Sequence, residues 1–408
     1  MDDLHGDLRG IIEHLDHVQN LGIDVLYMTP IFKSYSSHKY DIIDYYQIDP
    51  SFGTTEDLRE LVQEAHKRGM KIVMDAVFNH TGREFFAFED IMEKGEKSKY
   101  LDWYYIEKFP LESERGEIPN YKCFGYYGGM PKLNLKNPEV EKFFTDVACY
   151  WIKECDIDGW RMDVGDEISH YFWKNFRRAV KAVKKDMLII GEIWHYAGDF
   201  LEGDEWDTVM NYPFYLNLID LLADEKINVS QFIQNLGYLK GRLNKKCYPL
   251  MWNLIDSHDT ARFLHLCDDN KKKQHLAAAF QLLLPGMPMI YYGDEFAMPG
   301  ANDPDCRRGM YWDEEYQDKE MFEWYKQLLK VRKNHACIVE GEPMELAARD
   351  EEETIVLTRK NGEETLALIF NCSSSARMFN EYAQKYDLLR ENPFDGKIEG
   401  LDAAVIVL

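Results

Sequence analysis

Four short apolar segments between positions 71 and 259 each end in acidic or histidine side chains. They are Lys71-Ile-Val-Met-Asp-Ala-Val-Phe-Asn-His80, Ile157-Asp-Gly-Trp-Arg-Met-Asp163, Met187-Leu-Ile-Ile-Gly-Glu-Ile-Trp194 and Pro249-Leu-Met-Trp-Asn-Leu-Ile-Asp-Ser-His-Asp259. Short apolar runs are typical of strands that a parallel sheet buries on both faces. One carboxylate after a strand can simply cap the next helix, but four independent caps are a poor explanation of this pattern. The segments therefore predict one functional site at the carboxyl ends of a parallel sheet.

Strands and helices alternate along most of the chain. Strand-like segments lie near Val25, Tyr40, Val73, Trp160, Ile189, Val209, Leu254 and Ile290. About eight such units close a (β/α)8 barrel, which is the fold class that we predict. The strand pattern is weakest near Tyr40 and Val209. The polar segment from His38 to Pro50 is predicted to be a loop that carries Tyr45 and Tyr46 and forms a wall of the site.

Two stretches depart from this alternation. Between Thr81 and Lys136 aromatic, glycine and charged residues are mixed without one period, which predicts a subdomain inserted after the third strand and over the site. Beyond Asn334 the pattern changes to short strand-like segments, which predict an antiparallel β-sandwich. We therefore predict a catalytic barrel at 1–80 and 137–335, an inserted subdomain at 81–136 and a C-terminal β-sandwich domain at 336–408.

The charge of the chain restricts its partners. The sequence has 48 Lys and Arg residues against 72 Asp and Glu residues, a formal net charge of −24, which disfavours nucleic acid and anionic membranes. It contains no apolar run long enough to span a bilayer, and its first residues lack the basic start and apolar core of a signal peptide. We expect a cytoplasmic protein. The eight cysteines occur singly, without zinc-like spacing, and are predicted to be reduced core residues.

Four motifs, taken in order, resemble the four signature regions of the α-amylase superfamily, glycoside hydrolase family 13. They are Asp75–His80, Gly159–Asp163, Gly191–Trp194 and Asn253–Asp259. Two more, Met130-Pro-Lys-Leu-Asn134 and Asp303-Pro-Asp-Cys-Arg-Arg308, resemble motifs of its cyclomaltodextrinase, neopullulanase and maltogenic amylase branch. The resemblance implies a retaining hydrolase that cleaves α-1,4 glucosidic bonds, with α-1,6 bonds as a second target. Its substrates would be maltooligosaccharides, cyclodextrins or pullulan.

The resemblance also assigns roles to three acids. Retaining glycoside cleavage needs a carboxylate nucleophile and a protonated carboxyl group about 5 Å apart across the bond. The family pattern makes Asp163 the nucleophile, Glu192 the acid/base and Asp259 a third acid that binds sugar hydroxyls. Glu192 would have to hold a proton near neutral pH, which the apolar neighbours Ile193 and Trp194 favour.

Further side chains are expected around these acids. Arg161 lies two residues before Asp163, so on a strand both project to the same side and the guanidinium can hold the nucleophile ionised. The resemblance adds these substrate-binding residues: His80, His258, Tyr45, Trp194, Asp303 and Arg307. The two histidines would donate hydrogen bonds to the sugar being cleaved, and Tyr45 would stack on it. Asp303 and Arg307 would hold the next sugar, with a surface ion pair as the alternative.

One departure from the family concerns metal binding. In α-amylases proper a Lys-His pair after the nucleophile serves substrate and calcium binding, whereas Gly165-Asp-Glu167 stands there in this chain. This favours the cyclomaltodextrinase branch and argues against the usual calcium site. Asn79 remains a candidate calcium ligand, although carboxylates and amides alone do not establish a site. No other cofactor is expected.

A second departure lies at the front of the chain. Members of this branch usually carry a β-sandwich domain before the barrel, which builds the dimer and covers the partner's site. This chain begins almost at the first barrel helix. We expect a more open site and a weaker preference for cyclodextrins, and both a monomer and a homo-oligomer remain open. The expected partner is an α-glucan oligosaccharide, with no nucleic acid and no membrane.

Two alternative functions follow from the same residues. The first is a predominantly transferring α-glucanotransferase, because transfer and hydrolysis share the glycosyl-enzyme intermediate and differ in whether a sugar or water attacks it. The second is a catalytically silent carbohydrate-binding homologue, because a fold alone does not confer activity. The presence of Asp163, Glu192, Asp259 and Arg161 argues against silence.

Overall fold

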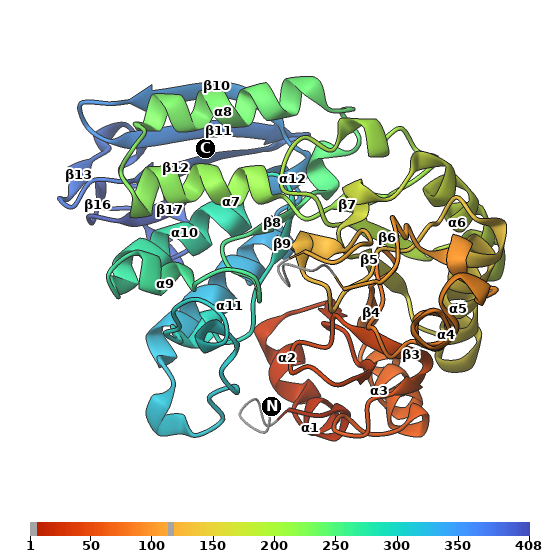
Figure 1. Cartoon of the computed structure of the whole chain (residues 1–408). Helices are drawn as coiled ribbons and strands as arrows, with labels where there is room; N and C mark the ends of the chain where they lie inside the picture. Colours follow the sequence, from red (N-terminus) through yellow and green to blue (C-terminus); the bar gives the residue numbers. More distant parts are fainter. Residues whose placement is uncertain (1–5, 113–117) are drawn as a thin grey trace. The chain divides into compact units, whose positions relative to one another are not determined.

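The computed structural model describes residues 6–112 and 118–408 (Figure 1). Residues 1–5 and 113–117 belong to the predicted barrel and inserted subdomain, and they lie outside the described residues, as do most of the residues in which a signal peptide was sought. The chain divides into two compact units. The first unit comprises Met1–Gln19, Ile23–Ile193 and Asp199–Val209, and the second comprises Asn20–Gly22, Trp194–Gly198 and Met210–Leu408.

A five-stranded parallel sheet organises the first unit. Its strands, in spatial order, are β1 (Val25–Tyr27), β4 (Lys71–Ala76), β5 (Gly159–Met162), β6 (Leu188–Gly191) and β7 (Thr208–Val209). Every residue of β5 is buried, and β4 is exposed only at its first residue. Burial on both faces explains why the sequences of β4 and β5 are continuous apolar runs rather than alternating ones.

Helices connect these strands, and local signals set their ends. The helices of this unit are α1 (Leu8–Glu13), α2 (Leu15–Leu21), α3 (Thr55–Lys67), α4 (Phe86–Lys94), α5 (Pro138–Cys155) and α6 (His170–Val183). A capping box between Thr54 and Asp57 starts α3, and the hydroxyl of Ser169 accepts from the backbone of Phe172 at the start of α6. His14 ends α1, and α2 begins at the next residue, Leu15.

The segment around Tyr40 differs from the prediction. A strand of the parallel sheet was expected near Tyr40 and a loop from His38 to Pro50, but neither description holds. Instead β2 (Phe32–Ser34) pairs antiparallel with β3 (Ile42–Ile48) in a separate two-stranded sheet, and Tyr40 lies between them. The burial pattern of β3 is irregular, with buried residues at its two ends and its centre, so its sequence shows no clean strand period.

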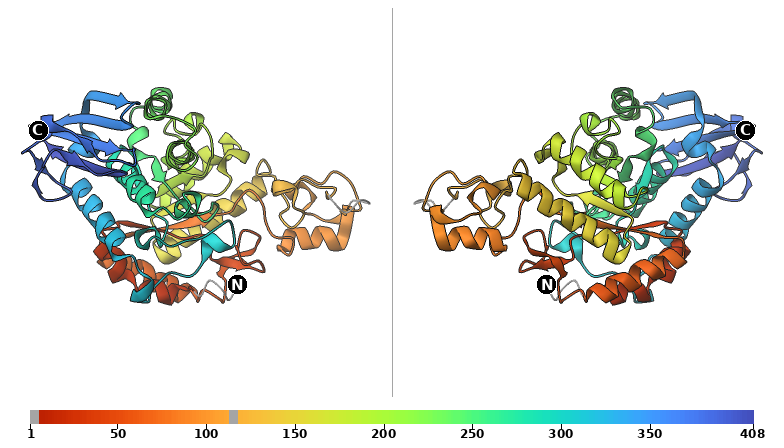
Figure 2. Two further views of the ribbon diagram at one scale, coloured as in Figure 1. Left: turned by 90° about the vertical axis from the view of Figure 1, so that its left-hand side faces the viewer. Right: turned by 90° about the vertical axis from the view of Figure 1, so that its right-hand side faces the viewer.

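The segment at 81–136 leaves the sheet after β4. Apart from α4 it contains short helical turns and isolated antiparallel bridges, including His80 with Lys132 and Cys123 with Pro131. Both views in Figure 2 show it projecting from the sheet of its own unit. Its irregular sequence therefore corresponds to an irregular structure, and its boundaries as a subdomain stay a prediction.

The second unit continues the alternation of parallel strands and helices. Its parallel strands are β8 (Trp252–Leu254) and β9 (Met287–Met289), and Met210 forms a parallel bridge with Trp252. Its helices are α7 (Tyr212–Leu218), α8 (Val229–Arg242), α9 (Phe263–Leu266), α10 (Lys271–Leu283), α11 (Lys319–Asn334) and α12 (Cys337–Glu340). Helix α11 ends at Asn334, the position beyond which the sequence pattern changes.

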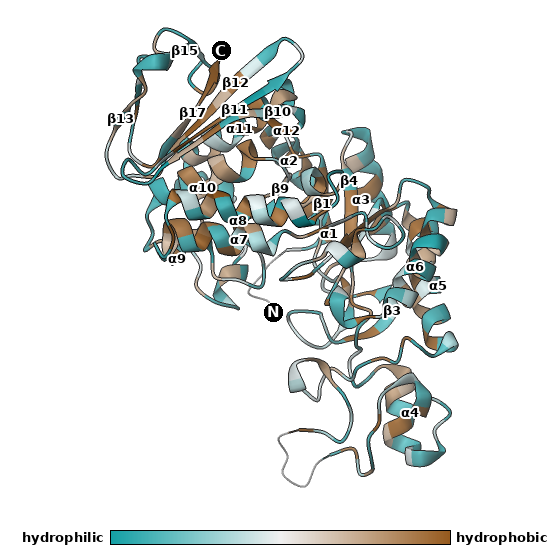
Figure 3. Ribbon diagram, turned by 90° about the horizontal axis from the view of Figure 1, so that it is seen from above, coloured by the Kyte–Doolittle hydropathy of each residue, from teal (hydrophilic) through white to brown (hydrophobic). Residues whose placement is uncertain are grey.

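The end of the second unit is antiparallel. A six-stranded sheet has the order β10 (Glu342–Arg349), β11 (Thr354–Asn361), β12 (Glu364–Asn371), β17 (Asp402–Val407), β14 (Tyr386–Asp387) and β15 (Asn392–Pro393). A small sheet of β13 (Arg377–Met378) and β16 (Lys397–Ile398) accompanies it. Ile369 and Ile406 of the large sheet pack with Phe379, Phe394 and Ile398 in one core. Figure 3 shows the apolar character of β12 and β17. The predicted change to strands beyond Asn334 is confirmed.

Candidate active site

The strand register brings the predicted acids of the first unit together. Met162 at the end of β5 pairs with Gly191 at the end of β6, so Asp163 and Glu192 are the next residues on two adjacent strands. The ladder continues past the strand ends, because the Glu192 amide donates to the Met162 carbonyl at 3.0 Å. Neighbouring strands lie about 4.8 Å apart, so this register places the two carboxyl groups close to each other.

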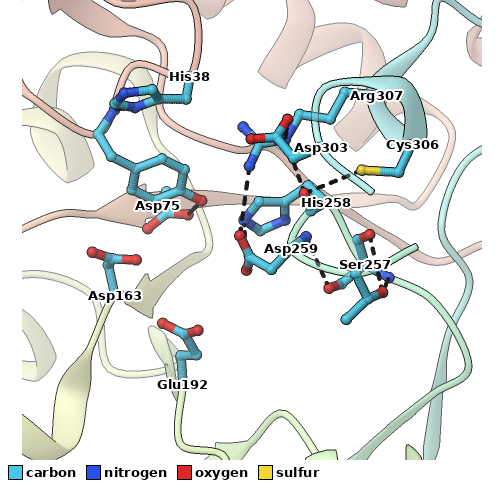
Figure 4. Close-up of polar contacts among 12 residues, drawn as sticks. His38, Asp75, Asp163, Glu192, Ser257, His258, Asp259, Asp303, Cys306 and Arg307 are labelled. Atoms are coloured by element: carbon cyan, nitrogen blue, oxygen red, sulfur yellow. Dashed lines mark hydrogen bonds and ion pairs between the residues drawn. The ribbon is translucent and has the colours of Figure 1, made fainter. Parts of the chain in front are cut away.

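Arg161 joins these acids to a third one. Its Nη1 lies 2.8 Å from Asp163 Oδ1 and 3.0 Å from Asp75 Oδ2, and its Nη2 lies 3.0 Å from Glu192 Oε2. Arg161 is fully buried, and the exposed fraction of each carboxylate side chain is below a tenth. Figure 4 shows the carboxyl groups of Asp163 and Glu192 side by side. One buried guanidinium thus fixes both candidate catalytic carboxyl groups.

Asp75 was not among the predicted site residues, although the sequence placed it on a strand of the site. It is the register partner of Arg161, and its Oδ2 accepts hydrogen bonds from Tyr27 Oη at 2.6 Å and Tyr40 Oη at 3.2 Å. Burial raises the pKa of Asp75 to about 6, against the lowering effect of the Arg161 charge. Asp75 is therefore a positioning residue behind the candidate nucleophile.

The turn after Asp163 has an unusual backbone. Val164 has φ 46° and ψ 44°, in the left-handed region that a β-branched residue rarely adopts. In this conformation the Val164 amide donates to Glu192 Oε2 at 2.9 Å, and the next amide, of Gly165, donates to the Glu192 carbonyl at 3.3 Å. The strained turn thus orients the carboxyl group of Glu192.

His80 is buried at the end of the chain segment that follows β4. Its Nε2 lies 3.1 Å from the Tyr40 carbonyl oxygen, which can only accept, so Nε2 carries the proton and donates it there. The ring stacks on Phe124 at a centroid distance of 5.1 Å, and burial lowers the pKa of His80 to about 4. His80 is therefore neutral at pH 7, and its role as a donor to substrate stays a prediction.

The predicted stacking role of Tyr45 is wrong. Its ring is 1% exposed and meets the ring of Phe144 edge-on at 4.9 Å, so no sugar can reach its face. Its hydroxyl donates to the carbonyl oxygens of Val77 and His80, which makes it a core residue. Tyr40, which the sequence reasoning missed, is half-buried and contacts Asp75. No signal in the sequence distinguished it, because the whole polar segment from His38 to Pro50 was interpreted as a loop wall.

Four predicted residues of the second unit form a separate group. His258 Nε2 lies 3.1 Å from Asp259 Oδ2, and Arg307 Nε lies 2.9 Å from the His258 carbonyl oxygen and 3.0 Å from Asp303 Oδ1 (Figure 4). The guanidinium also lies 3.6 Å from Asp259 Oδ1. The ion pair between Asp303 and Arg307 therefore exists, and it borders Asp259. Whether it also holds a sugar stays a prediction.

Trp194 belongs to the second unit and is 40% exposed. Its ring stacks on Tyr212 at a centroid distance of 3.8 Å and an interplanar angle of 13°. It lines a hollow of about 340 Å³ together with Tyr196, Leu216 and Tyr238. A half-exposed, fixed aromatic face beside a hollow is a surface on which a sugar ring can stack.

The residues around Asn79 do not fit a calcium ion. In the described part of the chain no group of three or more His, Cys, Asp or Glu side chains is placed to hold a metal. Asn79 is buried, and its Oδ1 accepts a hydrogen bond from Lys132 Nζ. The same ammonium group lies 2.7 Å from Glu167 Oε2. Because a positive charge already occupies both oxygen donors, this set does not offer a calcium ion the free oxygens that it needs.

None of the helices that the structure describes combines the length and the apolarity that a bilayer-crossing helix needs.

Two buried carboxyl groups that one arginine holds at the ends of adjacent parallel strands fit the class of glycosidases that work with a carboxylate pair. The comparisons with known proteins then name the family. Residues 1–341 match the family model "Alpha amylase, catalytic domain", and the chain belongs to the α-amylase family, glycoside hydrolase family 13. The predicted fold class, a (β/α)8 barrel with a C-terminal antiparallel sheet domain, is confirmed.

Three similar proteins belong to the branch that the motifs indicated. A cyclomaltodextrinase from Geobacillus thermopakistaniensis is 47% identical over 371 residues, which cover 91% of this chain and 63% of that protein. An intracellular maltogenic amylase from Bacillus subtilis is 43% identical over 367 residues, covering 90% and 62%. A solved structure named cyclomaltodextrinase superposes with a TM-score of 0.94 at 39% identity, covering 98% of this chain and 71% of the other. The chain thus spans less than two thirds of either sequence relative.

Proposed function

We propose that this chain is a retaining α-glucan hydrolase that opens α-1,4 bonds, with α-1,6 bonds as a second target, in maltooligosaccharides, cyclodextrins or pullulan. The observation that carries the proposal is the single guanidinium of Arg161, which contacts both Asp163 and Glu192 at adjacent strand ends. Retaining glycosidases need their two carboxyl groups closer together than inverting ones, which must leave room for a water molecule. Family membership and the names of the relatives support the substrate class.

The proposed reaction has two steps. Asp163 attacks the anomeric carbon while Glu192 gives its proton to the oxygen of the departing sugar, so the glycosidic bond breaks and an ester to Asp163 forms. Glu192 then takes a proton from water, which attacks the same carbon and releases Asp163. Asp259 would bind sugar hydroxyls and favour the distorted, oxocarbenium-like state. Arg161 keeps Asp163 ionised and therefore nucleophilic.

Product analysis tests this proposal. The purified chain is incubated separately with maltotriose, γ-cyclodextrin, pullulan and starch, beside the variants Asp163→Asn, Glu192→Gln and, as a matched control, Asp166→Asn. Asp166 is an exposed acid three residues after the candidate nucleophile. We expect glucose, maltose or panose from the native chain and from Asp166→Asn only. Absence of products from a folded native chain would favour the binding homologue instead.

Stereochemistry tests the retaining mechanism separately. Proton NMR during the first turnovers distinguishes the anomers of the released reducing end before they equilibrate. We expect the α-anomer, because two inversions at the same carbon restore the original configuration. Initial release of the β-anomer would contradict the assignment of Asp163 as a covalent nucleophile.

Glycosyl transfer is a second candidate activity, and the aromatic hollow lined by Trp194 supports it as a surface on which an acceptor sugar could stack. In a transfer reaction an acceptor sugar competes with water for the glycosyl-enzyme intermediate. Reactions with added glucose decide between the two outcomes. Products longer than the substrate in excess over hydrolysis products would make transfer the main activity.

We further propose a cytoplasmic location, which the name of the intracellular relative supports.

A further inference from the structure

A buried amide and an acidic side chain meet one lysine beside the candidate active site. Lys132, in the segment at 81–136, places its Nζ against Asn79 Oδ1 and 2.7 Å from Glu167 Oε2. The same Nζ lies 3.4 Å from the Glu167 carbonyl oxygen, and Asn79 Nδ2 donates to Glu167 Oε2 at 3.2 Å. Three oxygen atoms from two separate chain segments therefore surround one ammonium group.

These three residues come from the parts of the first unit that frame the candidate nucleophile. Asn79 follows β4 and precedes His80, whose backbone bridges that of Lys132. Glu167 ends the short helical turn Gly165–Glu167, which begins two residues after Asp163. The Lys132 side chain is 19% exposed, so water reaches the ammonium only in part.

We infer that the ammonium group of Lys132 acts as a built-in cation that replaces a divalent metal ion and ties the segment at 81–136 to the strand end and turn that position Asp163. In a calcium site, converging oxygen atoms hold a cation that is a free ion. Here the cation is the ammonium group of Lys132, which is covalently attached to the chain. Lys132 is a positioning residue in this role, since it reaches the reacting groups only through Asn79, His80 and Glu167. The chain should therefore neither need nor bind calcium at this place.

The chemistry of the set allows a direct test. Replacing Lys132 by an aspartate removes the fixed cation and adds two carboxylate oxygens next to Asn79 and Glu167, which is a donor set suited to calcium. The variants are Lys132→Asp, Lys132→Met and Lys132→Arg. The matched control is Lys122→Met, which removes an exposed lysine from the same segment, where its Nζ lies over the Tyr105 ring at 5.3 Å.

Thermal unfolding of the full chain is measured with a chelator and with millimolar calcium chloride, and magnesium chloride serves as the ion control. We expect the native chain and Lys122→Met to unfold at the same temperature in all three conditions. Lys132→Met should unfold a few degrees lower in each of them. Lys132→Asp should unfold lower with the chelator and recover with calcium along a saturable curve, because only this variant has an ion site.

Several results would overturn the inference. A saturable calcium-dependent rise of the native melting temperature would show that a metal binds despite Lys132. If Lys132→Met unfolds at the same temperature as Lys122→Met, the ammonium group of Lys132 does not tie the two segments together. A folded Lys132→Asp without any calcium response would contradict the equivalence of the ammonium and a metal ion. This thermal test does not depend on the proposed activity, so it decides even if the chain cleaves none of the substrates.

Where turnover is measurable, kinetics separate positioning from mere stability. We expect Lys132→Met to lower kcat about 10- to 100-fold at a temperature where the variant is fully folded, since small displacements near reacting groups cost about that much. Lys132→Arg should recover most of the rate because it keeps the charge. Unchanged kcat in folded Lys132→Met would contradict the positioning role.

Discussion

Arg161 is the residue on which three acidic side chains of the first unit converge. Its replacement by methionine would leave buried carboxyl groups without a compensating charge. We expect Arg161→Met to lower the free energy of unfolding by about 3–5 kcal/mol in urea titrations. Arg178→Met, on the exposed side of α6, is the control and should stay within about 0.5 kcal/mol of the native chain. Equal effects of the two substitutions would contradict the bridging role of Arg161.

His80 should make the fold sensitive to acid. Its pKa is lowered from 6.5 to about 4 by burial, so the unfolded chain takes up a proton that the folded chain refuses. The stability that this group contributes is therefore present above pH 6.5 and is lost as the pH falls through the window from 6.5 to 4. We expect the stability advantage of the native chain over His80→Gln to shrink by up to about 1.4 kcal/mol per pH unit there. An advantage that is equal at pH 7.5 and pH 4.5 would contradict a neutral buried His80.

At the residue scale, Asp163, Glu192 and Arg161 could be predicted from the sequence better than the aromatic residue expected to stack on the sugar. Charged groups after apolar strands have few reasons to be buried other than a site, so Asp163 and Glu192 could be found from position alone. A tyrosine serves equally well in a core and on a surface. Tyr45 and Tyr40 therefore could not be distinguished without knowing that Phe144 packs against Tyr45.

The end of β6 depends on a glycine. A Cβ atom at Gly191 would lie 2.2 Å from the buried ring of Trp206, which also stacks on Phe200 at a centroid distance of 4.1 Å. We expect Gly191→Ala to lower the free energy of unfolding by about 1–3 kcal/mol, because the methyl group would overlap a ring that is buried and stacked on Phe200. The measurement is chemical denaturation monitored by tryptophan fluorescence.

A second glycine provides the matched control for this element. Gly237 lies on the exposed side of α8, and no atom comes within 4 Å of a Cβ added there. Gly237→Ala should raise the free energy of unfolding by about 0.5–1 kcal/mol through the higher helix propensity of alanine. The two Gly→Ala substitutions should thus change the free energy of unfolding in opposite directions. Changes in the same direction would contradict the packing described for β6.

Elements with a local signal could be predicted closely. The helix α5 (Pro138–Cys155) begins with an Asn137 cap and a proline, two start signals that the sequence itself shows. The pairing of β2 with β3 could not be predicted, because its register shifts twice and each shift breaks the two-residue period. The exact path of the segment at 81–136 was also beyond sequence reasoning, since isolated bridges leave no periodic pattern.

At the scale of the whole molecule the eight cysteines are all free, as predicted, and each is buried or half-buried. Burial raises the pKa of Cys155 to about 11 and that of Cys267 to about 12, so few thiolates form near neutral pH. We expect slow, partial reaction of the native chain with a thiol reagent at pH 8 and complete reaction of eight thiols in denaturant. Fast reaction of most thiols in the native chain would contradict the burial of these residues.

The amide of Val164 has one more consequence for the carboxyl group that it contacts. Glu192 Oε2 accepts from this amide at 2.9 Å and lies 3.0 Å from the positively charged Arg161 Nη2, so one donor and one positive charge face that oxygen. Both favour negative charge on Oε2 over a hydrogen there. If Glu192 is the acid, we therefore expect its transferable hydrogen on Oε1. The two oxygens of the group then differ chemically before any sugar arrives, and we expect a glycosidic bond to be protonated from the Oε1 side.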